Sequence, residues 1–172
     1  GLAARKGWLF RGGDVIETAA ALDRVVFDKT GTLTIGRPLV TEVFADSPER
    51  LLQLAASLEQ SSRHPLAHAL MQEAQRRNLP LLPTAEVRTL SGQGLEGQLD
   101  GSNDLIRVGQ PDWLCQTGVV IPEMARSWLD AASGSVVAVA CDKQLLGLVQ
   151  IEDQMRPDVG GALQRMRSQK LK

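Results

Sequence analysis

Residues Val25–Thr34 read "VVFDKTGTLT". A continuously apolar run ends at Asp28, and Lys29, Thr30 and Gly31 follow it. A short apolar run of this kind is typical of a strand buried in a parallel sheet. Because open α/β sheets bind ligands beyond the carboxyl ends of their strands, we expect Asp28 to lie at a ligand site. The structural alternative is an aspartate that only caps the turn after a strand.

The residues after Asp28 indicate what that ligand site would do. Asp28 offers a nucleophile, Lys29 a nearby cation, Thr30 a hydroxyl group, and Gly31 a tight turn with free backbone N–H groups. This set suits transfer of a phosphoryl group to the carboxylate, which would give an aspartyl-phosphate.

Composition limits the class of protein. The chain has 172 residues, of which 43% are hydrophobic and 23% charged, enough for one large domain or two small ones. A net charge of −1 argues against a nucleic-acid partner held by bulk charge. The longest apolar run, Val136–Cys141, is far shorter than the roughly 18 residues that a membrane span needs. The two cysteines, Cys115 and Cys141, are predicted to be reduced core residues, with a disulfide or a metal site as alternatives.

Periodicity predicts the order of the elements. Helices are expected at 13–24, 48–58, 65–77, 121–133 and 156–169, and strands at 25–28, 36–46, across 85–108 and across 135–153. The fold class is therefore mixed α/β and α+β. An antiparallel sheet flanked by helices, at 37–150, is inserted into a partial Rossmann-like domain, at 1–36 and 151–172. Ser47 is predicted to be the N-cap of the second helix.

The stretch "DKTGTLT", Asp28–Thr34, resembles the phosphorylation signature of the P-type ATPases within the haloacid-dehalogenase superfamily. The resemblance implies that Mg-ATP phosphorylates Asp28, that Lys29 and Thr30 belong to the same site, and that Mg²⁺ uses Asp28, Thr30 and residues absent from this chain. Phosphatases of the superfamily carry a second aspartate two places after the nucleophile, as general acid and base. Thr30 occupies that place, so a phosphoenzyme would hydrolyse slowly.

A second constellation is "LEQSSRHPLAHAL", Leu58–Leu70. Read alone, His64 could simply begin a helix, or pair with His68 as metal ligands, although neither a third ligand nor an HExxH glutamate is present. The segment resembles the "SEHPLA" stretch of the heavy-metal-transporting, type IB P-type ATPases. That resemblance implies that His64 orients the adenine of ATP and that Glu59 contacts it. Arg63 replaces a frequent glutamate, and His68 is expected on a solvated face.

Glycines complete the predicted nucleotide site. Gly92, Gly94 and Gly97 are spaced like a dinucleotide fingerprint, but alternating residues follow where that fingerprint needs a helix, so a Rossmann site is rejected. The type IB resemblance implies that Gly92 and Gly94 let the nucleotide lie against the backbone. Gly97 is expected to serve a strand or a bulge. Gly109 matches a later family glycine, and Gln110 stands where the family has asparagine.

The resemblance covers nearly the whole chain. "ARKGWLFRGGDVIE", Ala4–Glu17, resembles the segment between the membrane helices and the phosphorylation domain, and Ile151–Arg167 resembles the return into that domain. The family's "TGD" and "GDGxND" segments, its "TGE" actuator sequence and its membrane helices are not in these 172 residues. We therefore expect a fragment with a complete nucleotide-binding domain and an incomplete phosphorylation domain. Its ends, before about 36 and after about 150, should be less well ordered or pair in a non-native way.

The resemblance implies the ATP-binding cytoplasmic region of a heavy-metal cation-transporting P-type ATPase. Its cofactors would be ATP and Mg²⁺. Its partners would be the actuator domain and membrane helices of a multi-pass parent at the cytoplasmic face of a membrane, and a metallochaperone. Copper(I) is the first expectation for the ion, with zinc, cadmium or lead as alternatives. A non-catalytic nucleotide-binding module and a soluble aspartate-nucleophile phosphatase are the other candidate functions.

Overall fold

The computed structural model describes residues 5, 7, 9 and 11–171. Contacts between residues divide the chain into two compact units, one made of the described residues up to Thr34 together with those from Met155 onward, the other of Ile35–Gln154. The functional assignment of 1–36, 37–150 and 151–172 stays a prediction. The N-terminal flank expected at Ala4–Glu17 lies partly outside the described residues.

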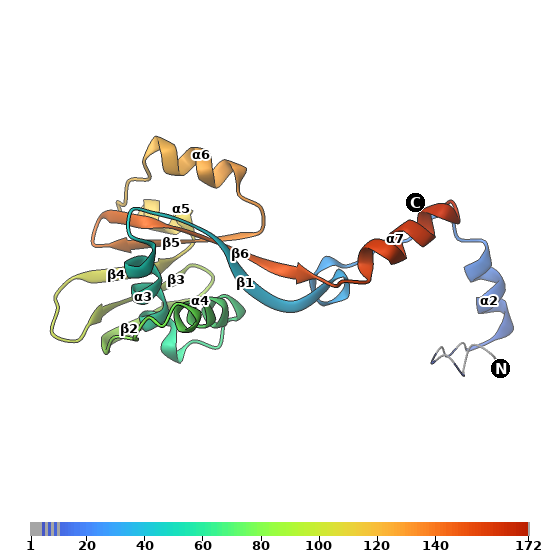
Figure 1. Cartoon of the computed structure of the whole chain (residues 1–172), viewed down its shortest axis with the longest axis horizontal. Coiled ribbons are helices and arrows are strands. Elements are labelled where there is room, and N and C mark those ends of the chain that lie inside the picture. The colour runs from blue at the N-terminus through green and yellow to red at the C-terminus, as the bar shows by residue number, and fades with distance from the viewer. Residues whose placement is uncertain (1–4, 6, 8, 10, 172) are drawn as a thin grey trace. The chain divides into compact units, whose positions relative to one another are not determined.

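Figure 1 labels the helices and strands. They are α2 (Gly13–Ala20), β1 (Thr34–Ala45), α3 (Pro48–Leu58), α4 (Pro65–Arg76), β2 (Thr84–Leu90), β3 (Gly94–Leu99), β4 (Leu105–Gly109), α5 (Pro111–Gln116), α6 (Glu123–Ala131), β5 (Ser135–Cys141), β6 (Gln144–Met155) and α7 (Val159–Ser168).

One six-stranded sheet organises the second unit. Its strand order is β1-β6-β5-β4-β3-β2, and each pair from β2 to β6 is antiparallel. Neighbouring strands of the sequence therefore pair with each other, except that β1 joins the far edge beside β6. The predicted antiparallel sheet flanked by helices is confirmed.

Alternation along the strands builds a core on each face of the sheet. Val137 and Val139 of β5 point to the face covered by α3 and α4, whereas Ala138 and Ala140 point to the face covered by α5 and α6 (Figure 1). The first core is the larger and is rich in leucine and valine. Small alanines on the second face leave room for Trp113 of α5.

Local signals placed most elements correctly. Helix α3 begins at Pro48 after Ser47, although the Ser47 side chain makes no capping hydrogen bond. Helix α5 was not foreseen, because six residues are too few to show a helical period. Both cysteines are free, as predicted, but Cys115 is exposed and is not a core residue.

The strand expected at Val25–Asp28 is not formed, and this prediction is wrong. The segment is extended without ladder hydrogen bonds, because the described residues of its unit hold no neighbouring strand for it beyond the ends of β1 and β6. The side chains of Val25, Val26 and Phe27 nevertheless alternate in exposure. Val25 and Phe27 line an apolar hollow with Leu163 and Met166 of α7, while Val26 is exposed.

The described helices are short or carry polar residues. None of them is both long enough and apolar enough to cross a bilayer.

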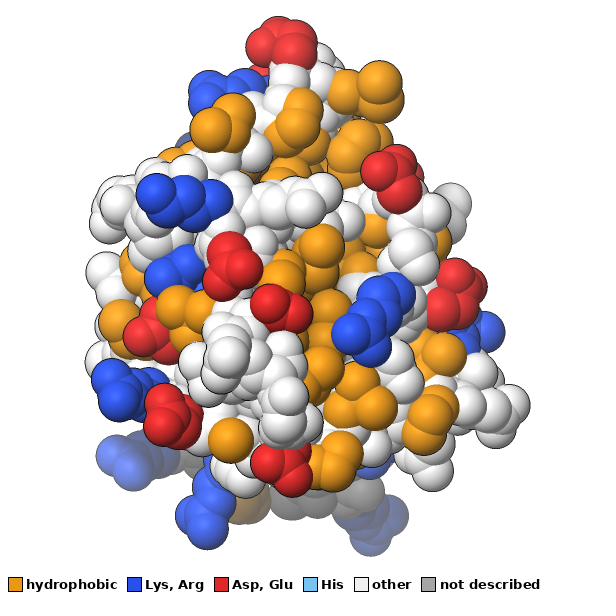
Figure 2. Space-filling model, turned by 90° about the vertical axis from the view of Figure 1, so that its left-hand side faces the viewer, with side chains coloured by type: hydrophobic (Ala, Val, Ile, Leu, Met, Phe, Trp, Pro, Cys, Tyr) orange, Lys and Arg blue, Asp and Glu red, His pale blue; other side chains and the backbone are white. Residues whose placement is uncertain are grey.

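Charge on the surface is mixed rather than concentrated. Figure 2 shows acidic and basic side chains interspersed with apolar ones on the face that it presents. Recognition on this face would therefore depend on individual side chains and not on a field of one sign.

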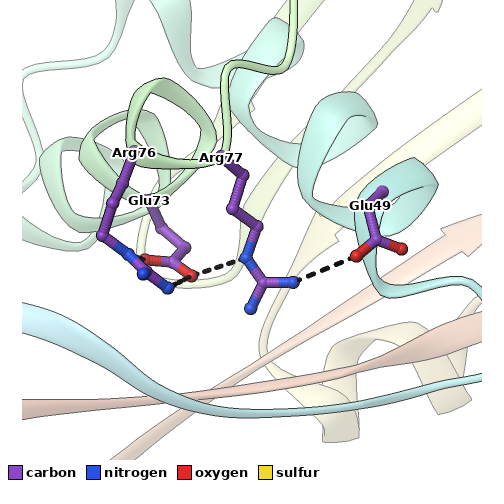
Figure 3. A network of polar contacts seen from close by, with 4 residues as sticks. All are labelled: Glu49, Glu73, Arg76 and Arg77. Atoms are coloured by element: carbon purple, nitrogen blue, oxygen red, sulfur yellow. Dashed lines mark hydrogen bonds and ion pairs between the residues drawn. The ribbon is translucent and has the colours of Figure 1, made fainter.

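An ion-pair network joins the start of α3 to the end of α4 (Figure 3). The buried Glu73 carboxylate accepts two hydrogen bonds from Arg76, both 2.7 Å long, and one of 2.7 Å from Arg77 Nε. Arg77 also reaches Glu49 at 3.4 Å. These contacts fix the helical hairpin whose connection carries Glu59 and His64.

We predict that Glu73→Gln destabilises the fold in a pH-dependent way. The hydrogen bond from Arg76 is the main reason why the pKa of the Glu73 carboxyl is lowered in the folded chain. A lowered pKa stabilises the fold above the unfolded-state pKa of about 4.3, and that stabilisation is lost as the pH falls through the folded value. The variant should lose about 1–2 kcal/mol at pH 7, since the Arg76 side chain is largely exposed to solvent screening.

Thermal unfolding followed by circular dichroism at pH 7 and pH 3 tests this prediction. Glu49→Gln is the matched control, because its single 3.4 Å contact is exposed and should contribute little. If the difference in melting temperature between wild type and Glu73→Gln stays the same from pH 7 to pH 3, the stabilisation by Glu73 is not electrostatic.

Candidate functional site

A pocket of about 230 Å³ opens in the second unit where the α3–α4 connection meets β2, β3 and β4. Its lining mixes apolar walls with a few polar groups. The lining residues are Glu59, Ser62, His64, Leu66, Thr89, Leu90, Gly92, Gln93, Gly94, Leu95, Val108, Gly109, Gln110, Val136 and Val137. All the residues predicted to bind nucleotide, from Glu59 to Gly109, are thus brought to one place.

Glu59 is the most unusual side chain of the pocket. It begins a 3₁₀ turn, Glu59–Ser61, directly after α3, and only 8% of it is exposed. Its Oε2 atom is buried without a hydrogen-bond partner. Burial raises the pKa of the Glu59 carboxyl, against the opposing effects of the Ser62 hydroxyl and the His64 ring. A buried carboxylate oxygen without a partner favours a ligand that carries a hydrogen-bond donor.

His64 is held in one orientation by the start of α4. It is the N-cap residue, and the Leu66 backbone N–H donates to its Nδ1 atom at 3.2 Å. The His64 backbone N–H in turn donates to Ser62 Oγ at 3.2 Å. Because Nδ1 accepts, the neutral ring carries its proton on Nε2. His68, one turn further on, is exposed and does not line this pocket, as expected for a solvated face.

The glycines of the pocket are required for different physical reasons. Gly92 lies in the turn between β2 and β3 with φ +73°, a left-handed conformation that favours glycine, and nothing would touch a side chain there. Gly94 and Gly109 are paired across β3 and β4. A Cβ on either would collide with backbone atoms of the neighbouring strand and with the Trp113 ring. Their small size is therefore required by packing within the protein.

This result refines the role predicted for Gly94. The family resemblance implies that the missing side chain lets the nucleotide lie against the backbone, and this stays a prediction. The space that a Cβ of Gly94 would take is occupied by Val108, Gly109 and Trp113, so packing also requires glycine there. Gly97, expected to serve a strand, lies within β3, and β3 pairs antiparallel with both neighbours. A strand and not a helix follows Gly94, so the glycine spacing is not a dinucleotide fingerprint.

Other polar lining residues were missed by sequence reasoning. Ser62 and Thr89 carry hydroxyl groups to the pocket, and the backbone of Gln93 accepts a 2.8 Å hydrogen bond from the Gln110 N–H. Gln110 is exposed at the N-cap of α5. The spacing of "SSRHP" hinted at Ser62, because a serine two residues before a helix N-cap can bond to its backbone. Nothing local pointed to Thr89.

The residues predicted for phosphoryl transfer lie in the first unit. Asp28, Lys29 and Thr30 are exposed at the start of an irregular turn, Lys29–Leu33, with Gly31 at φ +76°. The buried Thr34 hydroxyl closes this turn, because it accepts a 3.0 Å bond from the Gly31 N–H and donates to the Lys29 carbonyl at 3.2 Å.

Arg156, directly after β6, supports the same turn. Its Nε and Nη2 atoms donate to the carbonyls of Thr32 and Gly31, at 3.0 and 3.3 Å, and its backbone N–H donates to the Leu33 carbonyl at 2.9 Å. These three bonds join segments that are more than 120 residues apart in sequence. The turn after Asp28 is thus defined by long-range as well as local bonds.

The turn can supply only part of a Mg²⁺ shell. Among the described residues, the one group of three carboxylate, histidine or cysteine ligands in close reach is Asp104, Cys141 and Asp142, in the second unit. Mg²⁺ commonly uses one or two carboxylates together with water and substrate phosphates. Asp28 therefore fits as one ligand, and a complete shell requires phosphate oxygens, water or further residues.

Comparisons with known proteins bear on this site. Residues 22–172 match the sequence profile of the family described as haloacid dehalogenase-like hydrolase. The chain is 38% identical to a manganese-exporting P-type ATPase of Mycobacterium leprae and 41% identical to a probable copper-transporting ATPase, SynA, of Synechococcus. Each alignment covers 98% of this chain, but 24% and 21% of the relative. The chain therefore spans about a quarter of the length of these relatives.

A solved structure agrees in fold. A zinc-transporting PIB-type ATPase in the E2.Pi state superposes with a TM-score of 0.77 at 33% identity, over 99% of this chain and 28% of that one. The predicted resemblance to heavy-metal P-type ATPases is confirmed. These three relatives are named for three different metals, so the comparisons do not single out copper.

We predict that Glu59→Gln raises thermal stability at neutral pH. A carboxyl with a raised pKa contributes stability below its unfolded-state pKa, and that contribution is lost as the pH rises through the folded value. Ionised Glu59 therefore opposes folding at pH 7.5, and removing its charge should gain about 1 kcal/mol. The gain should vanish near pH 4, where Glu59 is itself protonated.

Melting temperatures measured by calorimetry at pH 7.5 and near pH 4 test whether Glu59→Gln is more stable than wild type at the higher pH only. The exposed Glu86→Gln serves as control and should change little at either pH. A lower melting temperature for Glu59→Gln at pH 7.5 would show instead that the carboxylate is stabilised where it lies.

Proposed function

Because the chain belongs to the haloacid dehalogenase-like hydrolase family, we propose that it is the ATP-binding and phosphoryl-accepting part of a heavy-metal P-type ATPase. The observation that carries the proposal is the unpartnered Oε2 atom of Glu59 in a pocket with largely apolar walls. A planar base with an exocyclic amino group fits both properties, since the walls would cover its faces and Glu59 would accept its N–H.

Adenine is the base we propose. Its exocyclic amine would donate to Glu59, and the fixed His64 ring would set its orientation beside Leu66. The pocket, at about 230 Å³, is smaller than the roughly 300–1,000 Å³ of most ligand sites. It therefore suits one base, with the ribose and triphosphate extending past the open turn at Gly92.

Asp28 is the acceptor we propose for the phosphoryl group. A carboxylate oxygen of Asp28 would attack the γ-phosphorus, the bond from that phosphorus to the bridging oxygen would break, and ADP would leave with the electron pair. Mg²⁺, when bound, neutralises charge on the phosphates. Lys29 would add positive charge beside the same oxygens. Thr30 offers no carboxylate to activate water, so the aspartyl-phosphate would persist and a phosphatase is disfavoured.

The whole protein that we propose is longer than this chain. It would be a multi-pass membrane protein with the described units at its cytoplasmic face, and with an actuator domain, membrane helices and a metallochaperone as partners. Among heavy metals, copper(I) is our first candidate, because the relative with 41% identity is named as copper-transporting. Manganese and zinc are the alternatives suggested by the names of the other relatives.

ATP titration of this chain by calorimetry tests the nucleotide site. We expect His64→Ala and Glu59→Ala each to weaken ATP binding by about tenfold, because each removes an orienting contact worth roughly 1–2 kcal/mol. His68→Ala is the matched control, since His68 is exposed on the same helix and does not line the pocket. Equal affinities in wild type and His64→Ala would defeat the assigned role of His64.

Phosphorylation of the complete transporter tests Asp28. With radiolabelled γ-phosphate, we expect an acid-stable, hydroxylamine-sensitive label that depends on the transported metal and is lost in Asp28→Asn. Comparing Cu(I), Mn(II) and Zn(II) in the same assay identifies the ion. A label that survives Asp28→Asn would show that Asp28 is not the phosphoryl acceptor. Stimulation of labelling by Mn(II) or Zn(II) but not by Cu(I) would show that copper is not the transported ion.

A further inference from the structure

Trp113 lies directly behind the nucleotide pocket without lining it. It comes from α5, is 5% exposed, and belongs to the core on the α5–α6 face of the sheet. The pocket lining includes Gly94 and Gly109 but not Trp113. The two glycines thus form a thin floor, with the pocket on one side and the indole ring on the other.

The contact between ring and floor is close. A Cβ on Gly94 would lie 2.9 Å from Cζ3 of Trp113, and a Cβ on Gly109 would lie 2.8 Å from Cε3. Real Cβ atoms essentially never come within 3.0 Å of a neighbour. The edge of the six-membered ring therefore occupies the space that side chains on both glycines would need. No other side chain reaches both glycines this closely among the nearest neighbours of each.

The backbone around this floor is also tied to α5. The Gln110 N–H donates to the Gln93 carbonyl at 2.8 Å, one residue beyond the glycine pair on each strand. The Leu114 N–H then donates to the Gln110 carbonyl at 3.1 Å as α5 begins. The helix that carries Trp113 therefore starts from the rim of the pocket, and a shift of the indole would be transmitted to the floor.

We propose that Trp113 is a positioning residue for nucleotide binding, because its indole ring sets the height of the Gly94–Gly109 floor on which the base lies. This inference rests on the proposed ATP site. Strand pairing holds Gly94 and Gly109 in register. Because neither glycine has a side chain, the group packed against them determines how far their main chain can move perpendicular to the sheet. Trp113 supplies a wide, rigid surface for that purpose.

Substitution of Trp113 tests the proposal against a general loss of stability. Trp113→Leu should weaken ATP binding by about tenfold, since a site displaced by a fraction of an ångström loses its aligned contacts. Trp113→Phe keeps an aromatic ring and should recover most of the affinity. Leu114→Ala is the matched control, because Leu114 is fully buried in the same helix and core but lines neither the pocket nor the glycine pair.

The comparison is made by ATP titration at a temperature where every variant is folded, with melting temperatures recorded alongside. We expect Leu114→Ala to melt earlier and yet bind ATP nearly as wild type does. Equal losses of affinity in Trp113→Leu and Leu114→Ala would overturn the proposal. So would wild-type affinity in Trp113→Leu. If the wild-type chain itself fails to bind ATP, the proposed function fails, and the two failures are thereby distinguished.

Wild-type protein gives a second test that needs no variant. Addition of ATP should shift the NMR signal of the Trp113 indole N–H, although the ring is outside the pocket. The indole of Trp128 in α6, whose N–H donates to Glu42 at 3.0 Å, serves as internal reference. A Trp113 signal that moves no more than that of Trp128 at saturating ATP would contradict the proposed support.

Discussion

The position of the Glu59 carboxylate depends on how α3 packs against the sheet. Leu51, Leu52 and Leu58 of this helix are almost completely buried, and Glu59 follows Leu58 directly. Burial of the last helical turn therefore brings the carboxylate into an apolar wall, where its Oε2 atom has no partner. Removing a carboxylate from water opposes folding, so the leucines of α3 must supply the free energy that keeps it there.

The pocket is built from two kinds of constraint. On one side, the α3–α4 connection presents Glu59 and His64, with orientations set by burial and by a capping hydrogen bond. On the other, β3 and β4 present main chain, because Gly94 and Gly109 leave it bare. A flat ligand between them would meet polar atoms at its edge and apolar or backbone surface on its faces. That combination is typical of base recognition.

Local sequence signals predicted much of the fold. The Ser-Pro and His-Pro pairs located the starts of α3 and α4, and alternation with an Asp-Gly turn located the strands between β2 and β4. The site residues Glu59 and His64 were found through their resemblance to a family segment. Their burial and hydrogen bonds could not be found in this way, because these depend on packing between distant segments.

The errors arose where a residue's state depends on partners far away in sequence. Val25–Asp28 has the composition of a buried strand, but a strand requires a neighbour to receive its hydrogen bonds. The packing role of Gly94 was likewise hidden, because Trp113, which fills the space that a Cβ of Gly94 would need, belongs to a helix too short to be predicted. In both cases the local pattern was correct and the nonlocal partner decided its meaning.

Nucleotide recognition and phosphoryl acceptance use separate sets of bonds. The turn after Asp28 is closed by Thr34 and by Arg156, all within the first unit. The pocket around Glu59 is closed within the second unit. Among the described residues, each set of bonds is complete within its own unit, so the local order of the acceptor turn is explained by Thr34 and Arg156 alone.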